Sequence, residues 1–172
     1  MTKLEAARRQ IESAIWLWFV GDDYVSVYAL TTAARRFLLE LAALSETETW
    51  PYAPAYMETP AEGRRPEADD AVTFFKYAKK DDTYEVSEQW TELCLFDAVM
   101  AYSNLTPDRC GSALMSTFVL RFGVERQDLF IPDAFSLLER KVSSAFNVER
   151  LERLSKIEFL QEFLGLLVGP VA

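Results

Sequence analysis

The chain has 172 residues, a length that suits one ordinary domain, and half of them are hydrophobic, as in a packed globular protein. It carries 18 Lys and Arg against 27 Asp and Glu. The resulting net charge of −9 disfavours sequence-independent binding to the phosphate backbone of nucleic acid. It contains no histidine, which excludes a Ser-His-Asp triad, a Cys-His pair and an HExxH zinc site.

The cysteines and the apolar runs indicate in which cellular compartment the protein is found. Cys94 and Cys110 are too few for a disulfide framework and lack the spacing of metal ligands. The apolar runs at 14–20 and 163–168 are much shorter than the ~20 residues that cross a bilayer. The first residues form a charged amphipathic pattern rather than a signal peptide. We therefore expect a cytoplasmic protein with free thiols and no membrane partner.

Residues 3–20 are predicted to form the first helix. Its apolar residues recur with helical spacing, at Ile11, Ala14, Ile15, Trp18 and Phe19. Trp16, Leu17 and Val20 fall outside this stripe, so the second half of the helix is apolar nearly all round. Such helices are central in a core or lie in an oligomer interface, and we take these three residues as a candidate interface.

Gly21 is expected to end the first helix, and Asp22 or Asp23 to cap a second one over 24–44. The short link predicts an antiparallel αα-hairpin. The expected buried face of the second helix consists of Val27, Leu30, Ala34, Phe37, Leu41 and Leu44. Residues expected to point elsewhere are Arg35, Arg36 and Glu40.

Residues 45–68 interrupt the helical pattern, because they hold four of the seven prolines. They also contain Trp50, Tyr52 and Tyr56, which indicates a segment that packs back on the body. Two interpretations stay open: an ordinary packed crossover, or a cover over a groove. This connection is the only break in what we otherwise expect to be a single domain over 1–172.

The rest of the chain continues with helical patterns. Further helices are predicted at about 70–80, 87–105, 109–122 and 132–146, and a last one from Asn147 to the Gly169-Pro170 pair. No stretch shows sustained alternation of apolar and polar residues, so no strand is predicted. The sequence therefore predicts an all-α bundle of about six to seven helices.

Asp97 is the most unusual polar residue. It follows Trp90, Leu93 and Cys94 by seven, four and three residues, so it should lie in an apolar helix face. A carboxylate there needs a partner or a raised pKa. Lys76 and Arg121 are the candidate partners. Asp97 is then either half of a structural ion pair or a ligand-binding or acid–base group.

No cofactor or metal is expected. The acidic pairs at 22–23, 69–70 and 81–82 are explained by helix caps and turns. Phosphate-cradling, dinucleotide-binding, nucleophile-elbow and CxxC motifs do not occur. The candidate site residues are therefore those that would line a groove, namely Asp97, Lys76, Tyr77, Tyr28 and Arg121.

Two stretches resemble an uncharacterised family of small all-helical bacterial proteins. They are AIWLWFVGDDYVSVYAL at 14–30 and FFKYAKKD at 74–81, with LFDAV following at 95–99. The resemblance implies a helical fold but no established activity. The family pattern has histidines where this chain has Tyr77 and Tyr28, so an activity that needed them would be absent here.

The bundle also resembles HEPN-type domains, whose ribonuclease motif combines an arginine with a histidine and so does not occur here. That likeness implies an inactive RNA-associated relative. The sequence does not determine a function. We expect a protein-interaction or oligomerisation module without catalysis, and the alternatives are a small-molecule binder or enzyme with an Asp/Lys groove, or the inactive HEPN-like protein.

Overall fold

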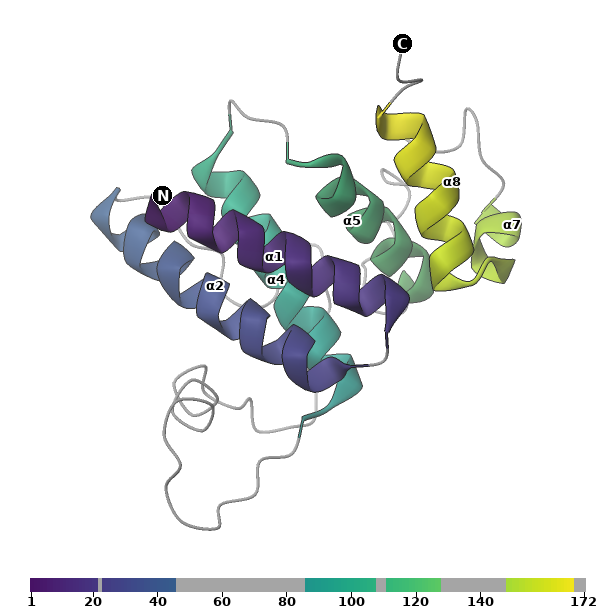
Figure 1. Ribbon diagram of the computed structural model, residues 1–172, viewed down its shortest axis with the longest axis horizontal. Helices are drawn as coiled ribbons and strands as arrows, with labels where there is room; N and C mark the ends of the chain where they lie inside the picture. Colours follow the sequence, from purple (N-terminus) through teal and green to yellow (C-terminus); the bar gives the residue numbers. More distant parts are fainter. Residues whose placement is uncertain (22, 46–85, 108–110, 128–147, 169–172) are drawn as a thin grey trace.

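The computed structural model describes residues 1–21, 23–45, 86–107, 111–127 and 148–168 (Figure 1). This part of the chain contains no strand and six helices, which confirms the predicted all-α fold. They are α1 (Lys3–Val20), α2 (Tyr24–Leu44), α4 (Glu88–Leu105), α5 (Ala113–Glu125), α7 (Val148–Arg153) and α8 (Lys156–Val168). None of them is long and apolar enough to cross a membrane.

The chain begins with an antiparallel hairpin of α1 and α2, as predicted (Figure 1). Thr2 caps α1 through a reciprocal arrangement with Glu5. Gly21 follows in an extended conformation, and the Asp23 carboxylate accepts a hydrogen bond from the Ser26 N–H at 3.1 Å. These local caps explain why both helices have the predicted bounds.

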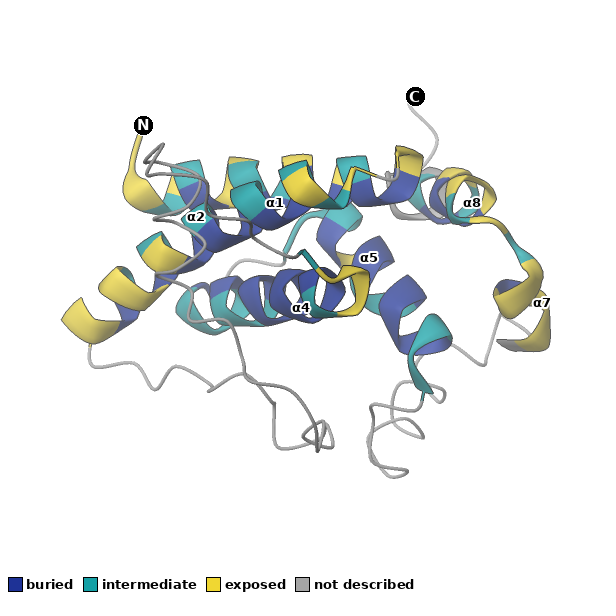
Figure 2. Cartoon of the chain, turned by 90° about the horizontal axis from the view of Figure 1, so that it is seen from below, coloured by how far each residue is buried: buried dark blue, intermediate teal, exposed yellow. Residues whose placement is uncertain are grey.

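Helices α4 and α5 pack beneath this hairpin. Figure 2 shows α1 and α2 as one layer, with their buried faces turned toward α4 and α5. Aromatic rings fill the space between the layers, where Trp18 meets Phe118 edge-to-face at 4.9 Å between ring centroids. Phe96 stacks on Phe122 at 4.7 Å. Helix α8 adds Phe159 and Phe163 to the same core through its contacts with α5 and α1.

Helix α4 is the central helix of the described structure. Every residue from Thr91 to Val99 is buried, so α4 has no solvent-exposed face over this stretch. Glu92 and Asp97 lie within it and are therefore acidic side chains inside the protein. A buried carboxylate is destabilising unless a cation or a hydrogen-bond donor contacts it. The partners of these two residues therefore determine how α4 is fixed to the neighbouring helices.

Two expectations about α2 were wrong. Arg35 is buried at 4% exposure instead of pointing away from the core, and Leu44 is 80% exposed. Arg35 is buried because α2 packs on α4 as well as on α1, so the buried face is wider than the apolar stripe, whereas Leu44 is exposed as the last residue of α2. Besides Val27 and Ala34, this face includes Tyr28, Thr31, Thr32, Arg35, Leu38 and Ala42.

Two further boundaries also differ from the expectation. Helix α5 begins at Ala113 rather than near 109, because the Ser112 hydroxyl caps it. The last helical pattern is broken into α7 and α8, since Ser155 forms a reciprocal pair of hydrogen bonds with Glu158 that starts a new helix. The helices predicted at 70–80 and 132–146, and the 45–68 connection beyond Ser45, lie outside the described residues.

Candidate functional site

Asp97 is paired with Arg35 between α4 and α2. The Arg35 Nε donates to Asp97 Oδ2 at 2.5 Å, and both side chains are almost completely buried. The prediction that Asp97 points into the interior is therefore confirmed, but its partner is an arginine that the sequence pattern had assigned to another face. An arginine at this distance neutralises the carboxylate and joins two helices. This contact favours the interpretation of Asp97 as half of a structural ion pair.

Tyr28 and Cys94 belong to the same interface between α2 and α4. They form a small buried cluster with Val86 and Trp90 packed against it. Burial raises the pKa of the Cys94 thiol to about 12, Arg35 lowers it, and Asp97 raises it. Tyr28 and Asp97 are thus both neighbours of Cys94 in this buried interface, which holds Cys94 as a neutral thiol.

Arg121, the second candidate partner of Asp97, has other contacts. Its guanidinium pairs with Glu125 at 2.7 Å and donates from Nη1 to the Leu151 carbonyl at 2.8 Å. Its Cζ also lies 5.1 Å from the centre of the Phe159 ring. Arg121 therefore connects α5 to α7 and α8 rather than completing a site with Asp97. Lys76 and Tyr77 lie outside the described residues.

A second polar cluster, which sequence reasoning missed, surrounds Glu92. Its carboxylate accepts a hydrogen bond from Trp18 Nε1 at 2.8 Å and lies 3.5 Å from Lys156 Nζ. Arg126 approaches its other oxygen at 3.7 Å. An acidic residue in the middle of an apolar helix was the available signal. It was overlooked because Glu92 does not share the helix face of Trp90, Leu93 and Asp97.

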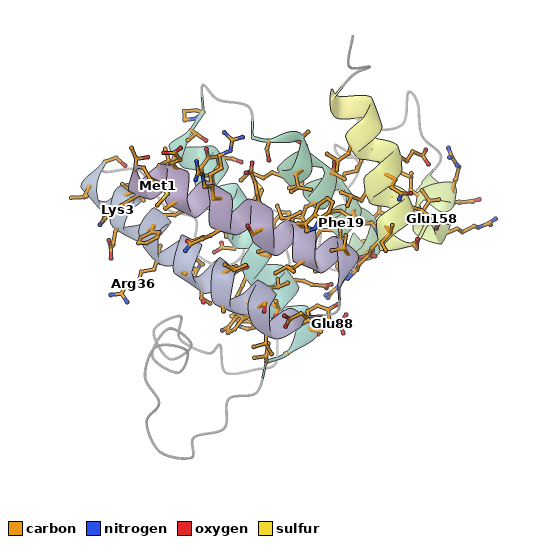
Figure 3. All side chains as sticks on the ribbon, in the orientation of Figure 1. Met1, Lys3, Phe19, Arg36, Glu88 and Glu158 are labelled. Atoms are coloured by element: carbon orange, nitrogen blue, oxygen red, sulfur yellow. The ribbon has the colours of Figure 1, made fainter. Side chains whose placement is uncertain are left out.

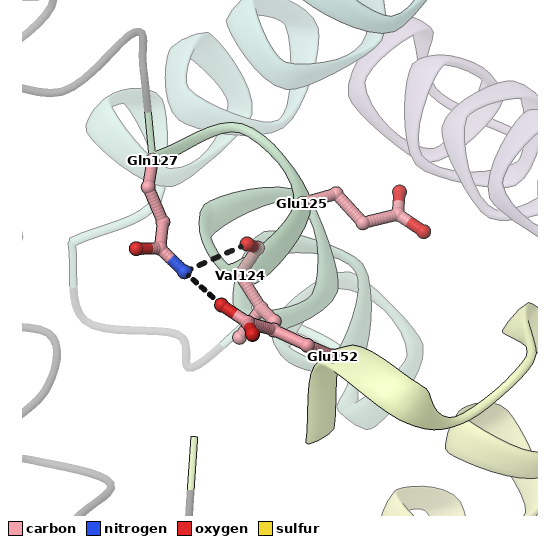
Figure 4. Close-up of a pocket in the computed structure, with 4 residues that line it drawn as sticks. All are labelled: Val124, Glu125, Gln127 and Glu152. Carbon is pink, nitrogen blue, oxygen red and sulfur yellow. Dashed lines mark hydrogen bonds between the residues drawn. The ribbon is translucent and has the colours of Figure 1, made fainter. Parts of the chain in front are cut away.

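A surface pocket of about 390 Å³ lies at the end of α5, lined by Val124, Glu125, Gln127 and Glu152 (Figure 4). The Gln127 amide donates to the Val124 carbonyl at 3.2 Å and to Glu152 at 2.7 Å. Glu125 is already paired with Arg121. The described residues contain no group of three side chains suited to hold a metal ion. The hydrogen bonds of these side chains thus hold the end of α5 to α7.

The candidate interface residues lie near the end of α1. Trp16 is 50% exposed and Val20 is 41% exposed, whereas Leu17 is partly buried and packs against the core. Trp16 and Val20 continue a surface stripe that begins with Glu5 and Arg9, which pair with each other at 3.3 Å. The stripe is thus polar in the first half of α1 and apolar in the second.

Comparison with models of protein families, with curated protein sequences and with solved structures found no match. The likenesses to small helical bacterial proteins and to HEPN-type domains therefore stay predictions from the sequence.

Proposed function

We propose that the chain is a self-association module, in which two copies pair through the end of α1 that carries Trp16 and Val20. The observation that carries this proposal is the exposure of half of the Trp16 side chain next to an exposed Val20, one helical turn further along. A large aromatic residue on a helix surface is typical of a contact that covers it.

The charge distribution favours a second copy of the chain as the occupant of this face. Residues 1–45 hold five basic and five acidic side chains and so have no net charge. These are Lys3, Arg8, Arg9, Arg35 and Arg36 against Glu5, Glu12, Asp22, Asp23 and Glu40. The other 13 Lys and Arg and 22 Asp and Glu account for the whole charge of −9. Two copies therefore repel each other least when they meet through the hairpin.

The geometry of a two-fold contact also suits the surface formed by Trp16 and Val20. In an isologous interface the same surface meets itself, so crossed α1 helices bring Trp16 of one copy against Val20 of the other. Leu17 supports this surface from the core side rather than covering the partner. Because two side chains cover much less than the ~800 Å² per partner of a standard interface, we expect a weak and reversible dimer.

The test is the solution mass measured by light scattering over a range of concentrations. The wild-type mass should rise from 19.7 kDa toward twice that value, and Trp16→Glu should stay at the monomer mass. Leu44→Glu is the matched control, since it places the same charge on an apolar residue that is 80% exposed at the far end of α2. A wild-type chain that stays monomeric, or equal behaviour of the two variants, contradicts the proposal.

The alternative functions stay hypotheses. A small-molecule groove around Asp97 would need a ligand that competes with the Arg35 guanidinium for the carboxylate. An inactive RNA-associated function would need binding at low salt despite the charge of −9. Neither has a specific observation in its favour.

A further inference from the structure

Lys156, the first residue of α8, places its ammonium group among side chains of three other helices. The Nζ atom lies 4.0 Å from the centre of the Trp18 ring and 5.7 Å from that of the Tyr24 ring. It donates to the Tyr24 hydroxyl at 3.3 Å and to Glu92 Oε1 at 3.5 Å. The contacts combine a ring face with oxygen acceptors, which is how proteins bind an organic cation.

The walls around this ammonium are held together by bonds that do not involve α8. Trp18 Nε1 donates to Glu92, which joins α1 to α4. The Tyr24 hydroxyl donates to Glu88, and this hydrogen bond joins α2 to the start of α4. Glu88 lies beside the α1–α2 turn (Figure 3). The ring faces and the carboxylates therefore keep their arrangement without the lysine.

We propose that Trp18, Tyr24 and Glu92, with Glu88 holding the Tyr24 hydroxyl, form a binding site for a primary alkylammonium group, which Lys156 of the same chain occupies in this conformation. We call these four residues the ammonium cage. A primary ammonium donates hydrogen bonds to Tyr24 and Glu92 while it lies on the Trp18 ring. A quaternary ammonium has no N–H to donate, so the cage selects against it.

Helix α8 does not depend on Lys156 for its own integrity. Its first turn is held by the reciprocal bonds of Ser155 and Glu158, and its apolar face is anchored by Phe159, Leu160 and Phe163. Replacing Lys156 by alanine therefore empties the cage while the helix stays formed. The vacated space then accepts a small amine that reproduces the end of the lysine side chain.

The experiment is chemical rescue of Lys156→Ala, followed by thermal unfolding. We expect the variant to unfold about 5 °C below wild type, as for the loss of a partly buried cation–π contact. Ethylammonium chloride should raise its Tm in a saturable way, whereas tetramethylammonium chloride and NaCl at equal ionic strength should not. Wild type should not respond to ethylammonium beyond the NaCl effect, because its cage is filled.

Lys3→Ala is the matched control, since Lys3 pairs with Glu40 at 2.7 Å on the surface, with more than half of its side chain exposed. We expect little change in Tm and no rescue. Equal responses of Lys156→Ala to ethylammonium and tetramethylammonium, or no loss of Tm in Lys156→Ala, would overturn the proposal. If the variant is unfolded without amine, folding that depends on ethylammonium supports the cage, and persistent unfolding in its presence refutes it.

Discussion

Arg35 of α2 and Asp97 of α4 form an ion pair that leaves only 4% and 6% of their side chains exposed. Both residues lie near the middle of helices whose surroundings are mostly apolar. A charge-assisted contact in such an environment has few alternatives, because a shift of one helix along the other would separate the charges. The pair therefore fixes the register of α2 against α4.

Removing one member of this pair should strongly destabilise the protein. In Arg35→Met the Asp97 carboxylate stays buried without its arginine, and we expect the free energy of unfolding to fall by about 3–5 kcal/mol. Urea denaturation followed by circular dichroism measures this change. Arg36→Met is the control, because Arg36 is half exposed and approaches Glu40 only at 3.6 Å. Similar midpoints for the two variants would show that the buried pair does not hold α2 and α4 together.

The helix ends were accessible from the sequence because they depend on local chemistry. Asp23 and Gly21 mark the α1–α2 turn by interactions within a few residues, and the predicted bounds agree with the structure. The hydrogen bonds between Ser155 and Glu158 are equally local. The break between α7 and α8 was not predicted, because the apolar stripe continues across Ser155.

Side-chain partners were harder to predict, since they depend on how helices distant in sequence are placed. Asp97 was predicted to be buried from its own helix face, yet its partner Arg35 lies 62 positions away, on a face of α2 where it is buried together with Tyr28, Leu38 and Ala42. The contact between Trp18 and Glu92 spans 74 positions and has no local signature. Such pairs become visible only when the crossing of α4 beneath the hairpin is known.

Cys94 should be unreactive in the folded protein. Burial raises its pKa to about 12, so its thiolate fraction at pH 8 is about 10³-fold smaller than that of an ordinary thiol. In a Cys110→Ser background, alkylation by iodoacetamide should be slow without urea and fast in urea. Rapid alkylation of the folded chain would contradict the burial of this side chain.

The same shift predicts a loss of stability in alkali. Because the folded state holds Cys94 as a thiol, the stabilisation is complete below the ordinary pKa of 9.0 and is lost as the pH rises toward 12. The free energy of unfolding should therefore decrease over this range. Cys94→Ala lacks this contribution, so the difference between its pH profile and that of wild type isolates the thiol.

Arg121 should hold the C-terminal helices to the rest of the protein. Arg121→Met removes the donor to the Leu151 carbonyl and leaves that buried acceptor without it, at a cost of about 1–3 kcal/mol. Hydrogen exchange should become faster in α7 and α8 than in α1 and α2. Arg150→Met is the control, since Arg150 is 60% exposed and pairs with Glu162 at the surface. Uniform acceleration over all helices would indicate a general loss of stability instead.

Ser155 and Glu158 should make the start of α8 sensitive to acid. The Ser155 hydroxyl and N–H donate to the Glu158 carboxylate at 2.7 and 2.8 Å, and these bonds lower the pKa of Glu158 from its ordinary value of 4.5. The stabilisation is therefore present above pH 4.5 and is lost as the pH falls through the lowered pKa. Ser155→Ala should lower the Tm by about 2–4 °C at pH 7, as for the loss of a helix cap. This difference from wild type should shrink below pH 4, and one that stays constant down to pH 3 would show that Glu158 does not contribute through its charge.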